Sequence, residues 1–504
     1  MSRNVRRAYI ALSAFAFAVL AFAAVWLGGL NQDEGWYLYA AGLVGEGRMP
    51  YRDFFYTQGP LLPCVYSAFS WTWRVGGLLG ARILTCLIGL ASMILFAAAT
   101  RIVAPPSRRG AASAAAFMLL GCNLYHVYYT SIPKTYALAS LFVAAGIFLV
   151  AHALVSAGPR MRVASLFASG LSFAFAAGAR ISLGALLAVV GFSLLFAFRR
   201  FGWGFFWFGL GGALGLAVVY GPYVADPAAF AGLCAAQKYH AARGGFDVVF
   251  TVGSLSRLVR WYLPAFILFG LGAACCPRRG EPAPQRPDSF LLGLAIGGFF
   301  AVFAVQMLAP FPYEDYQVPV MGLFAMAASV LAARIEWLPQ SACALLALGL
   351  SWAASFGSPL LEKWTVNGQD RFWSVKKAKC ELAQLRDTAK LVEAIDPGGK
   401  TLLTQDLYLA IETRRKVPEG LEMGPFSILT DEEWRRLLEN CECPVAALSG
   451  YTFAIDPPRC TERPLMRQLE YWDLLKKRYS RVCREEAFGQ NATTLLILKR
   501  RATE

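Results

Sequence analysis

The sequence predicts a polytopic α-helical membrane protein of about eleven transmembrane helices, followed by a C-terminal soluble α/β domain. Hydrophobic residues make up 57% of the 504 residues and charged residues only 16%, and the mean hydropathy is +0.45. A chain this apolar is typical of membrane proteins. From about Ser358 charged residues become frequent. We therefore expect a transmembrane domain, residues 1–357, and a soluble domain, residues 358–504.

The predicted spans are apolar stretches, and a helix needs about twenty residues to cross a bilayer. The first could instead be the core of a cleaved signal peptide, since AFAA resembles a small-residue cleavage site. Its apolar run is longer than such a core, which favours a retained span. The apolar windows are 8–30, 76–100, 111–129, 135–156, 163–179, 181–198, 203–225, 258–276, 289–309, 316–334 and 338–356.

Many of the cations behind the net charge of +15 lie in short connections between these windows. Every second connection is basic, such as RIVAPPSRRG and GPRMR, and the positive-inside rule places these connections in the cytoplasm. The N-terminus would then be cytoplasmic, whereas the first outer loop, residues 31–75, and the soluble domain would be extracytoplasmic. Membrane orientation explains the positive charge without a nucleic-acid partner.

The soluble domain shows both helical and strand patterns. RFWSVKKAKCELAQLRDTAKLVEAI and DEEWRRLLENC have helical spacing, while KTLLT, PVAAL and TTLLILKR are typical of short strands. Its five cysteines would face an oxidising compartment, and CEC lacks the CxxC spacing of a zinc or redox site. We expect one or two structural disulfide bridges there.

A stretch rich in acids and aromatics directly follows the first apolar window. It reads NQDEGWYLYAAGLVGEGRMPYRDFFYTQGPLLP and begins with the acidic pair Asp33 and Glu34. Its aromatic residues would also suit a simple interfacial belt. A belt does not explain two acids at the end of a span, followed by a stretch of helical character that would lie along the membrane interface. We therefore predict a functional role for Asp33.

QDEGWYLYAAGLVGEGRMPYRDFFYTQGPLL resembles the first extracytoplasmic loop of GT-C glycosyltransferases, the membrane enzymes related to protein O-mannosyltransferases and aminoarabinose transferases. The likeness extends to the architecture of the whole chain. It implies a GT-C-like transmembrane catalytic domain, transfer from a polyprenyl-phosphate sugar with inversion, and Asp33 as the catalytic base. The element Tyr51-Arg52-Asp53-Phe54 with its Gly59-Pro60 turn also resembles the loop of bacterial members, which implies a bacterial-type inner (plasma) membrane.

Transfer from such a donor needs cations that stabilise the departing phosphate. Lys134 in SIPKTY and Arg180 in GARISLG are single cations at the outer ends of apolar windows. A charge there is costly unless it has a task or its side chain extends to the headgroups. We predict that both bind phosphate, with Arg243, Arg257 and Arg260 as weaker candidates.

The last outer loop, PFPYEDYQVP, lies where members of the family often have a Tyr-rich Pro motif along the lipid or sugar pocket. An interfacial belt would look similar. The predicted substrate-binding residues are Glu34, Arg52, Asp53, Gln58, Lys134, Arg180, Tyr313 and Tyr316.

One departure from the family concerns cofactors. In the aminoarabinose-transferase branch an acid and a Lys precede the corresponding proline and help to bind metal and phosphate, whereas this chain has YTQGP. We therefore expect no certain cofactor. A divalent ion remains an alternative if His240 combines with Asp53 or Glu34, because imidazole and carboxylate suit such ions.

The predicted function is a cell-envelope glycosyltransferase that moves a sugar from a polyprenyl-phosphate donor to an extracytoplasmic lipid, glycan or protein acceptor. Its partners would be these substrates and membrane lipids, with no nucleic acid. A transporter or lipid flippase is the alternative with similar architecture, although transporters place charges near the bilayer midplane and often contain internal repeats. A non-enzymatic envelope assembly protein is the third alternative.

Overall fold

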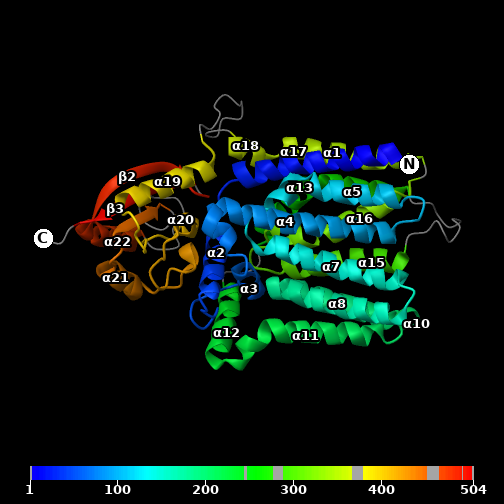
Figure 1. Cartoon of the computed structure of the whole chain (residues 1–504), viewed down its shortest axis with the longest axis horizontal. Helices are drawn as coiled ribbons and strands as arrows, with labels where there is room; N and C mark the ends of the chain where they lie inside the picture. Colours follow the sequence, from blue (N-terminus) through cyan, green and yellow to red (C-terminus); the bar gives the residue numbers. More distant parts are fainter. Residues whose placement is uncertain are drawn as a thin grey trace.

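Two regions make up the structure. A bundle of long helices forms the larger region, and a smaller α/β region packs on one end of it (Figure 1). The amino terminus lies at the opposite end of the bundle (Figure 1). The structure is a computed structural model, and it describes residues 3–242, 247–275, 288–335, 337–365, 379–450, 465–490 and 492–501.

Within the described residues, seven helices are long and apolar enough to cross a membrane, and a bent pair adds an eighth. The pair is α17 (Gln340–Phe356) with α18 (Pro359–Thr365), bent by 45°. The seven are α1 (Arg3–Phe22) with the π-helical turn η1 (Ala23–Leu27), α4 (Trp71–Val103), α7 (Thr135–Val155), α8 (Pro159–Ala179), α11 (Gly204–Ala225), α15 (Ser289–Met307), and α16 (Val318–Ala332) with the 3-10 turn η4 (Glu314–Gln317).

The three remaining predicted windows form shorter helices, so every apolar window is helical. The predicted number of about eleven spans includes these three, which by length alone fall short of a bilayer. The protein is a multi-pass membrane protein. The shorter helices are α5 (Arg109–Gly121) and α6 (Leu124–Tyr129), then η2 (Ile181–Leu183), α9 (Gly184–Phe196) and the single turn α10 (Phe198–Phe201), and then α14 (Leu263–Ala274).

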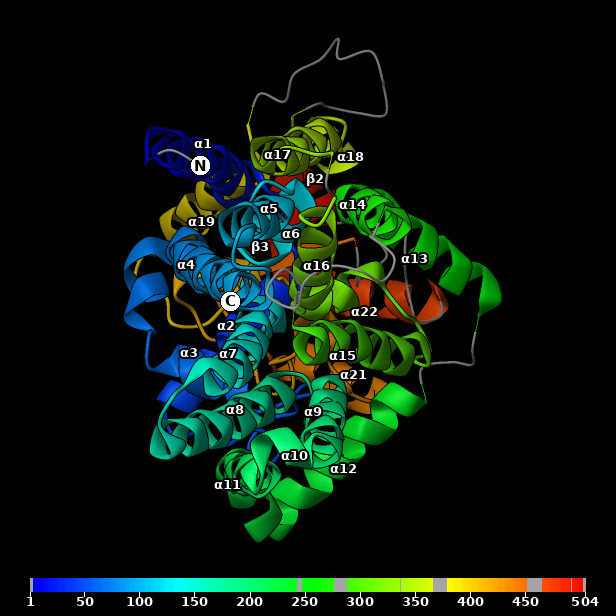
Figure 2. The same ribbon diagram turned by 90° about the vertical axis from the view of Figure 1, so that its right-hand side faces the viewer.

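Helix α16 occupies the centre of the bundle (Figure 2). It contacts α4, α5, α7, α14 and α15, and 94% of its apolar window is buried. A helix that is covered on all sides must be apolar all round, and the sequence VPVMGLFAMAASVLA contains no charge. Because η4 leads directly into α16, the acids of η4 have a fixed position at the end of the bundle.

Helix α2 (Gln32–Gly45) crosses the end of the bundle, between the bundle and the α/β region (Figure 1). We predicted a helix along the membrane interface, and the helix is present. Its surroundings differ from that prediction, because 10 of its 14 residues are buried between the bundle and the α/β region. The other helices outside the spans are α3 (Leu61–Ser67), α12 (Pro227–Ala241) and α13 (Val248–Trp261).

The α/β region contains a three-stranded antiparallel sheet in the order β1-β3-β2. The predicted strands PVAAL and TTLLILKR form β1 and β3, whereas KTLLT makes only isolated bridges. The helical pattern from residue 371 forms a helix from Glu381, and residues 371–378 lie outside the described ranges. The elements are α19 (Glu381–Ile395), α20 (Leu407–Thr413), η5 (Gly424–Phe426), α21 (Asp431–Asn440), β1 (Val445–Ser449), α22 (Leu465–Arg478), β2 (Tyr479–Phe488) and β3 (Thr493–Arg500).

Candidate active site

Asp33 lies in the first turn of α2, and the local sequence explains why the helix begins there. The side chain of Asn31, the N-cap, accepts a hydrogen bond from Asp33 N at 3.0 Å. Glu34 Oε1 accepts one from Asn31 N at 3.0 Å, which completes a capping box. The amino end of a helix favours negative charge. The sequence NQDE therefore places the Asp33 carboxylate where the helix stabilises its ionised form.

The second acid of the pair has a different environment. Glu34 and Arg82 of α4 are both fully buried and form a bidentate ion pair, with 2.6 Å from Arg82 Nη2 to Glu34 Oε1 and 2.7 Å from Nε to Oε2. The remaining guanidinium protons are donated to the carbonyls of Val25, Gly28 and Gly29 at 2.9 to 3.2 Å. All five donors of Arg82 thus have acceptors. The pair attaches α2 to α4 and satisfies carbonyls at the unwound end of the first span.

The Asp33 carboxylate faces Lys134, the residue directly before α7. Lys134 Nζ lies 2.8 Å from Asp33 Oδ2 and 3.3 Å from Asp315 Oδ2. Trp36 Nε1 donates to Asp33 Oδ1 at 3.1 Å, and Tyr136 OH donates to Asp315 Oδ2 at 3.0 Å. One ammonium group therefore lies between two carboxylates that are far apart in the sequence.

Arg180 supplies a second cation, at the connection between α8 and η2. Its guanidinium carbon lies 4.1 Å from the ring centre of Tyr316 and 5.2 Å from that of Tyr136. Stacking on aromatic rings leaves the edge of a guanidinium available for hydrogen bonds. Among the described residues no carboxylate forms an ion pair with Arg180. Its charge is therefore available to an anionic ligand.

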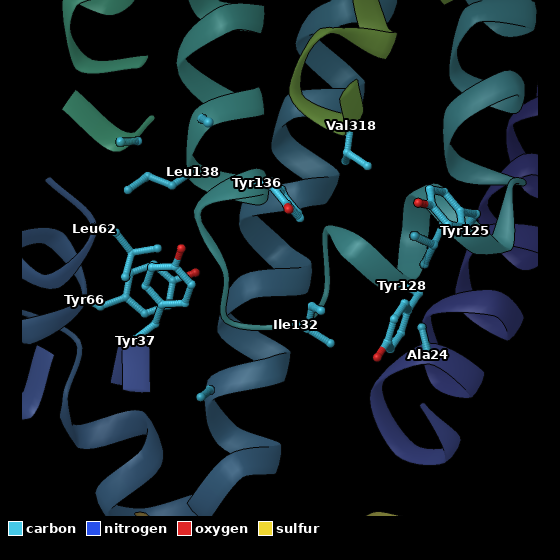
Figure 3. Close-up of a cluster of buried hydrophobic side chains, with 14 of the residues drawn as sticks. Ala24, Tyr37, Leu62, Tyr66, Tyr125, Tyr128, Ile132, Tyr136, Leu138 and Val318 are labelled. Carbon is cyan, nitrogen blue, oxygen red and sulfur yellow. The ribbon is translucent and has the colours of Figure 1, made fainter. Parts of the chain in front are cut away.

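These groups share one cavity of about 1130 Å³, which lies where the bundle meets the α/β region. Tyr37 and Tyr136 are among its aromatic residues, and Figure 3 shows both beside buried apolar side chains such as Leu62 and Val318. The polar and charged part of the wall consists of Asn31, Gln32, Asp33, Thr57, Gln58, Lys134, Arg180, Ser182, Gln237, Gln306, Glu314, Asp315 and Gln490.

The charge of Lys134 controls the ionisation of Asp33. Burial alone would raise the pKa of the Asp33 carboxyl, but the charge and hydrogen bond of Lys134 outweigh this effect and lower it below the usual value. Trp36 adds a hydrogen bond in the same direction. Asp33 is therefore ionised at neutral pH and can accept a proton, and any ligand that draws Lys134 away makes it a stronger base.

The fold has solved counterparts. ArnT from Cupriavidus metallidurans bound to undecaprenyl phosphate aligns over 97% of this chain and 98% of that chain, with TM-score 0.62 and 14% identity. The apo state of ArnT aligns over the same shares with TM-score 0.61. An Archaeoglobus fulgidus oligosaccharyltransferase has TM-score 0.47 at 11% identity and covers 98% of this chain and 74% of that chain. No family model and no curated protein matches the sequence.

ArnT belongs to the GT-C superfamily, and its alignment spans nearly the whole of both chains. The chain has the GT-C fold. The predicted fold class, a polytopic helical membrane protein with a C-terminal soluble α/β domain, is confirmed. At 14% identity the likeness establishes the fold, so the function of this GT-C fold has to be inferred from its own cavity.

Six of the nine residues that we predicted as catalytic or substrate-binding line the cavity of this GT-C fold. They come from α2, the loop before α3, the start of α7, the end of α8 and the η4 segment, which are far apart in the sequence. The six are Asp33, Gln58, Lys134, Arg180, Tyr313 and Tyr316.

The other three predicted residues lie elsewhere. Glu34 is buried in its ion pair with Arg82, so its carboxylate has no access to the cavity. Arg52 and Asp53 form an exposed ion pair at 2.9 Å, and Arg52 also contacts Asp226 at 3.3 Å. The prediction for Glu34 is therefore corrected, since this residue anchors a helix, whereas the Arg52–Asp53 pair lies outside the cavity wall and connects the first outer loop to α12.

The structure also describes some of the weaker candidates for phosphate or metal binding. Arg257 forms an ion pair with Glu314 at 3.0 Å, and Arg260 lies over the ring of Trp261. His240 belongs to α12 with its side chain outside the described part, and Arg243 lies outside it altogether. In the described residues no group of three or more His, Cys, Asp or Glu side chains could ligate a metal ion.

Sequence reasoning assigned no role to several groups in or beside the cavity. Tyr136 lies beside Lys134, and Phe426 and Gln490 come from the α/β region, whereas Asp315, which also contacts Lys134, belongs to the PFPYEDYQVP motif that we expected along the pocket. The sequence does indicate that Arg82 has a special role, because it is a single charge within an apolar window. The structural bridges that we expected do not form among the described cysteines, all of which are free, and Cys460 lies outside the described residues.

Proposed function

We propose that this chain is a membrane glycosyltransferase that moves a sugar from a polyprenyl-phosphate donor to an acceptor hydroxyl, with Asp33 as the general base. The observation that supports this most is the single cavity in which an ionised carboxylate and two cations, Lys134 and Arg180, lie together. The GT-C fold adds support, because ArnT with the same fold was solved bound to undecaprenyl phosphate.

The proposed reaction is a displacement at the anomeric carbon of the donor sugar. The acceptor oxygen attacks this carbon while Asp33 accepts its proton, and the bond from carbon to the phosphate oxygen breaks with its electron pair on the phosphate. Lys134 and Arg180 bind the phosphate and stabilise the charge that develops on it. Attack on the face opposite the phosphate inverts the anomeric configuration.

The contacts of Lys134 suggest how donor and base are coupled. In the free protein its ammonium is divided between Asp33 and Asp315. A donor phosphate beside Lys134 competes for the same charge, and a weaker contact with Asp33 raises the basicity of that carboxylate. Donor binding thereby prepares the base. Asp315, with its hydrogen bond from Tyr136, keeps Lys134 at the cavity wall.

We also propose that the protein lies in a bacterial-type inner membrane with a cytoplasmic N-terminus and residues 358–504 outside. The alternation of short basic connections supports this orientation. The cavity would then open at the outer membrane surface, where a polyprenyl lipid can present its phosphate. Lipid, glycan and protein acceptors all carry a suitable hydroxyl.

The location of the cavity favours an enzyme over a transporter or flippase. Transporters bind their substrates near the bilayer midplane, whereas this cavity lies at the end of the bundle and includes Phe426 and Gln490 of the α/β region. A scaffold for envelope assembly would also not need charged side chains such as Asp33, Lys134 and Asp315 to meet inside a cavity.

The test is transfer by purified protein in nanodiscs, supplied with undecaprenyl-phosphate hexose, pentose or uronic acid and with extracted envelope glycolipid, and analysed by mass spectrometry. Asp33→Asn retains size but cannot take a proton, so transfer should fall by about a hundredfold to ten-thousandfold. Asp53→Asn is the matched control outside the cavity and should stay within about threefold. Near-normal transfer by folded Asp33→Asn would refute the assignment of the base.

A further inference from the structure

The α/β region contacts the turn that precedes Asp33. Gln32 Nε2 donates to Asp406 Oδ1 at 2.8 Å and to Tyr408 OH at 3.2 Å, and Tyr408 OH donates to Asp406 Oδ1 at 2.8 Å. The backbone N of Gln32 donates to Gln490 Oε1 at 2.7 Å. Both the amide side chain and the backbone of the residue next to Asp33 are therefore bonded to the C-terminal part of the chain.

Two further contacts attach the same turn to the α/β region. Leu30 N donates to Glu381 Oε2 at 2.7 Å. Gly35 lies against the start of α20 so closely that a Cβ atom there would be 2.4 Å from Tyr408 N, nearer than packed atoms approach. Residues 30–35 thus meet the α/β region on both sides of Asp33, with glycine at the closest point.

The network is buried. Gln32, Asp406 and Tyr408 are 7%, 2% and 0% exposed. Hydrogen bonds among buried groups are strong and leave few alternative arrangements, so they restrict the conformations of the groups that they join. Gln32 and Gln490 line the cavity, but Asp406 and Tyr408 do not. Gln32 is the cavity-lining residue that Asp406 contacts directly, so an effect of Asp406 on chemistry can reach the cavity through it.

We propose that Asp406 is a positioning residue for Asp33, and that it acts through its hydrogen bond with Gln32. This rests on the proposed function in which Asp33 is the base. The C-terminal domain then has a defined task, which is to fix the direction of the catalytic carboxylate. A displacement of about 1 Å in a catalytic group can cost about a hundredfold in rate.

The test compares three variants in nanodiscs. Asp406→Leu removes the acceptor, Asp406→Asn retains an oxygen acceptor for Gln32 and Tyr408, and Tyr408→Phe removes only a hydroxyl. We expect Asp406→Leu to lower kcat for transfer about tenfold to a hundredfold with KM for the undecaprenyl-phosphate sugar within about twofold. Tyr408→Phe should lower kcat less, and Asp406→Asn should stay near wild type.

A second readout does not need catalysis. Amide hydrogen exchange of a peptide covering residues 30–36, followed by mass spectrometry, reports local opening of the turn. Asp406→Leu and Tyr408→Phe should exchange about tenfold faster there, whereas Asp406→Asn should match wild type. Binding of undecaprenyl phosphate should be unchanged in all three, because Lys134 and Arg180 are not touched.

The matched control is Lys416→Met. Lys416 forms an ion pair with Glu46 at 2.7 Å, which also joins the α/β region to α2 but at the other end of that helix. Its kcat and its exchange at residues 30–36 should equal those of wild type. Equal losses in Lys416→Met and Asp406→Leu would mean a general effect of loosening the interface and would overturn the proposal.

The outcomes separate this proposal from the proposed function. If Asp406→Leu and Tyr408→Phe fold but leave both kcat and exchange unchanged, the positioning role is wrong while the transferase stands. If no protein transfers sugar but exchange rises as expected, the proposed function fails and the attachment of the turn through Asp406 stands. If exchange rises without a change in kcat, the turn is attached but does not direct the base, which also overturns the proposal.

Discussion

Lys134 Nζ lies 2.8 Å from Asp33 Oδ2, so the carboxylate that we propose as the general base is already paired with a cation in the free protein. The pair explains how a partly enclosed acid stays ionised. The side chain of Asp33 is 27% exposed and that of Lys134 only 7%, so the ammonium is the more deeply fixed partner. A ligand approaching from the cavity therefore meets the carboxylate first.

The first prediction concerns pH dependence. Since the charge of Lys134 lowers the pKa of Asp33, Lys134→Met should raise that pKa, and the acid limb of the pH profile of kcat/KM should move to higher pH. Wild type should keep its activity to a lower pH than the variant, because a lowered pKa keeps the base ionised. Residual turnover measured between pH 4 and 8 checks this. An acid limb at the same pH in both proteins would mean that another group is the base.

The second prediction concerns phosphate. Arg180→Ala should weaken undecaprenyl phosphate binding about tenfold or more, since a charge-assisted hydrogen bond contributes about 1.5–3 kcal/mol. Arg180→Lys should recover part of the affinity, because it keeps the charge but not the fork of donors. Arg260→Ala is the control, as Arg260 lies over Trp261 outside the cavity wall. Equal affinity of Arg180→Ala and wild type in a lipid-binding titration would exclude Arg180 from the phosphate site.

The third prediction separates the two acids of the pair. Glu34→Gln leaves a fully buried Arg82 without its counter-charge, and breaking a buried pair in this way costs about 3–5 kcal/mol of stability. We therefore expect a lower Tm in detergent, together with a smaller loss of turnover per folded molecule than for Asp33→Asn. Calorimetry alongside transfer assays checks both. A variant with unchanged Tm but no turnover would return Glu34 to the catalytic site.

The fourth prediction uses the buried Asp406. Burial raises the pKa of its carboxyl above the usual range, and hydrogen bonds from Gln32 and Tyr408 only partly oppose this. Its stabilising contribution is therefore complete below about pH 4 and is lost as pH rises through the raised folded-state pKa. Asp406→Asn resembles the protonated form. The Tm of this variant should therefore increase relative to the Tm of wild type as pH rises from 4 to 7.

Asp387 offers the opposite sign as a control for that experiment. Hydrogen bonds from Lys379 and Lys390 and their charges lower its pKa, so its contribution is present above about pH 4 and lost as pH falls. The Tm of Asp387→Asn should therefore lie below that of wild type by a constant amount from pH 4 to 7, and the difference should shrink only below about pH 4. A Tm difference between Asp406→Asn and wild type that is equally constant from pH 4 to 7 would contradict the assignment of Asp406.

The fifth prediction concerns orientation. The α/β region and the amino terminus lie at opposite ends of the bundle (Figure 1), so reporters at the two termini should report opposite compartments. An alkaline phosphatase fused after Glu504 should be active, and a fluorescent protein fused before Met1 should fluoresce in the cytoplasm. The reverse pattern would place the cavity at the cytoplasmic surface of the membrane, away from a lipid-linked donor at the outer surface.

The predictions from sequence were most accurate where the environment of a residue follows from its neighbours in the chain. Apolar windows became helices, and two apolar runs became β1, whose residues are all buried, and β3, the central strand of the sheet. Strand β2 was missed because it lies at the edge of the sheet and has exposed charges, as at Arg484 and Glu486, instead of an apolar run. Lys134 and Arg180 were found because a charge at the end of a span is costly.

The rest of the site depends on contacts between distant residues. Gln32 and Gln490 are 458 positions apart, and no local pattern indicates that they are bonded. Glu34 was assigned to substrate because its partner Arg82 belongs to another helix. Periodicity identifies which side chains are buried but not which of them meet, so it could not show that Glu34 pairs with Arg82 or that Arg52 reaches Asp226.

The distance along the chain between Gln32 and Gln490 also sets an order of events during synthesis. The ribosome makes the turn around Asp33 long before Gln490, which lies 458 positions after Gln32, while domains fold progressively from the amino terminus. Contacts between such distant segments form late. The spans can enter the membrane long before residue 490 exists, so every nascent or prematurely terminated chain contains the reactive carboxylate without its final support. Under the positioning role proposed above, full activity would then need chains that extend through residue 490.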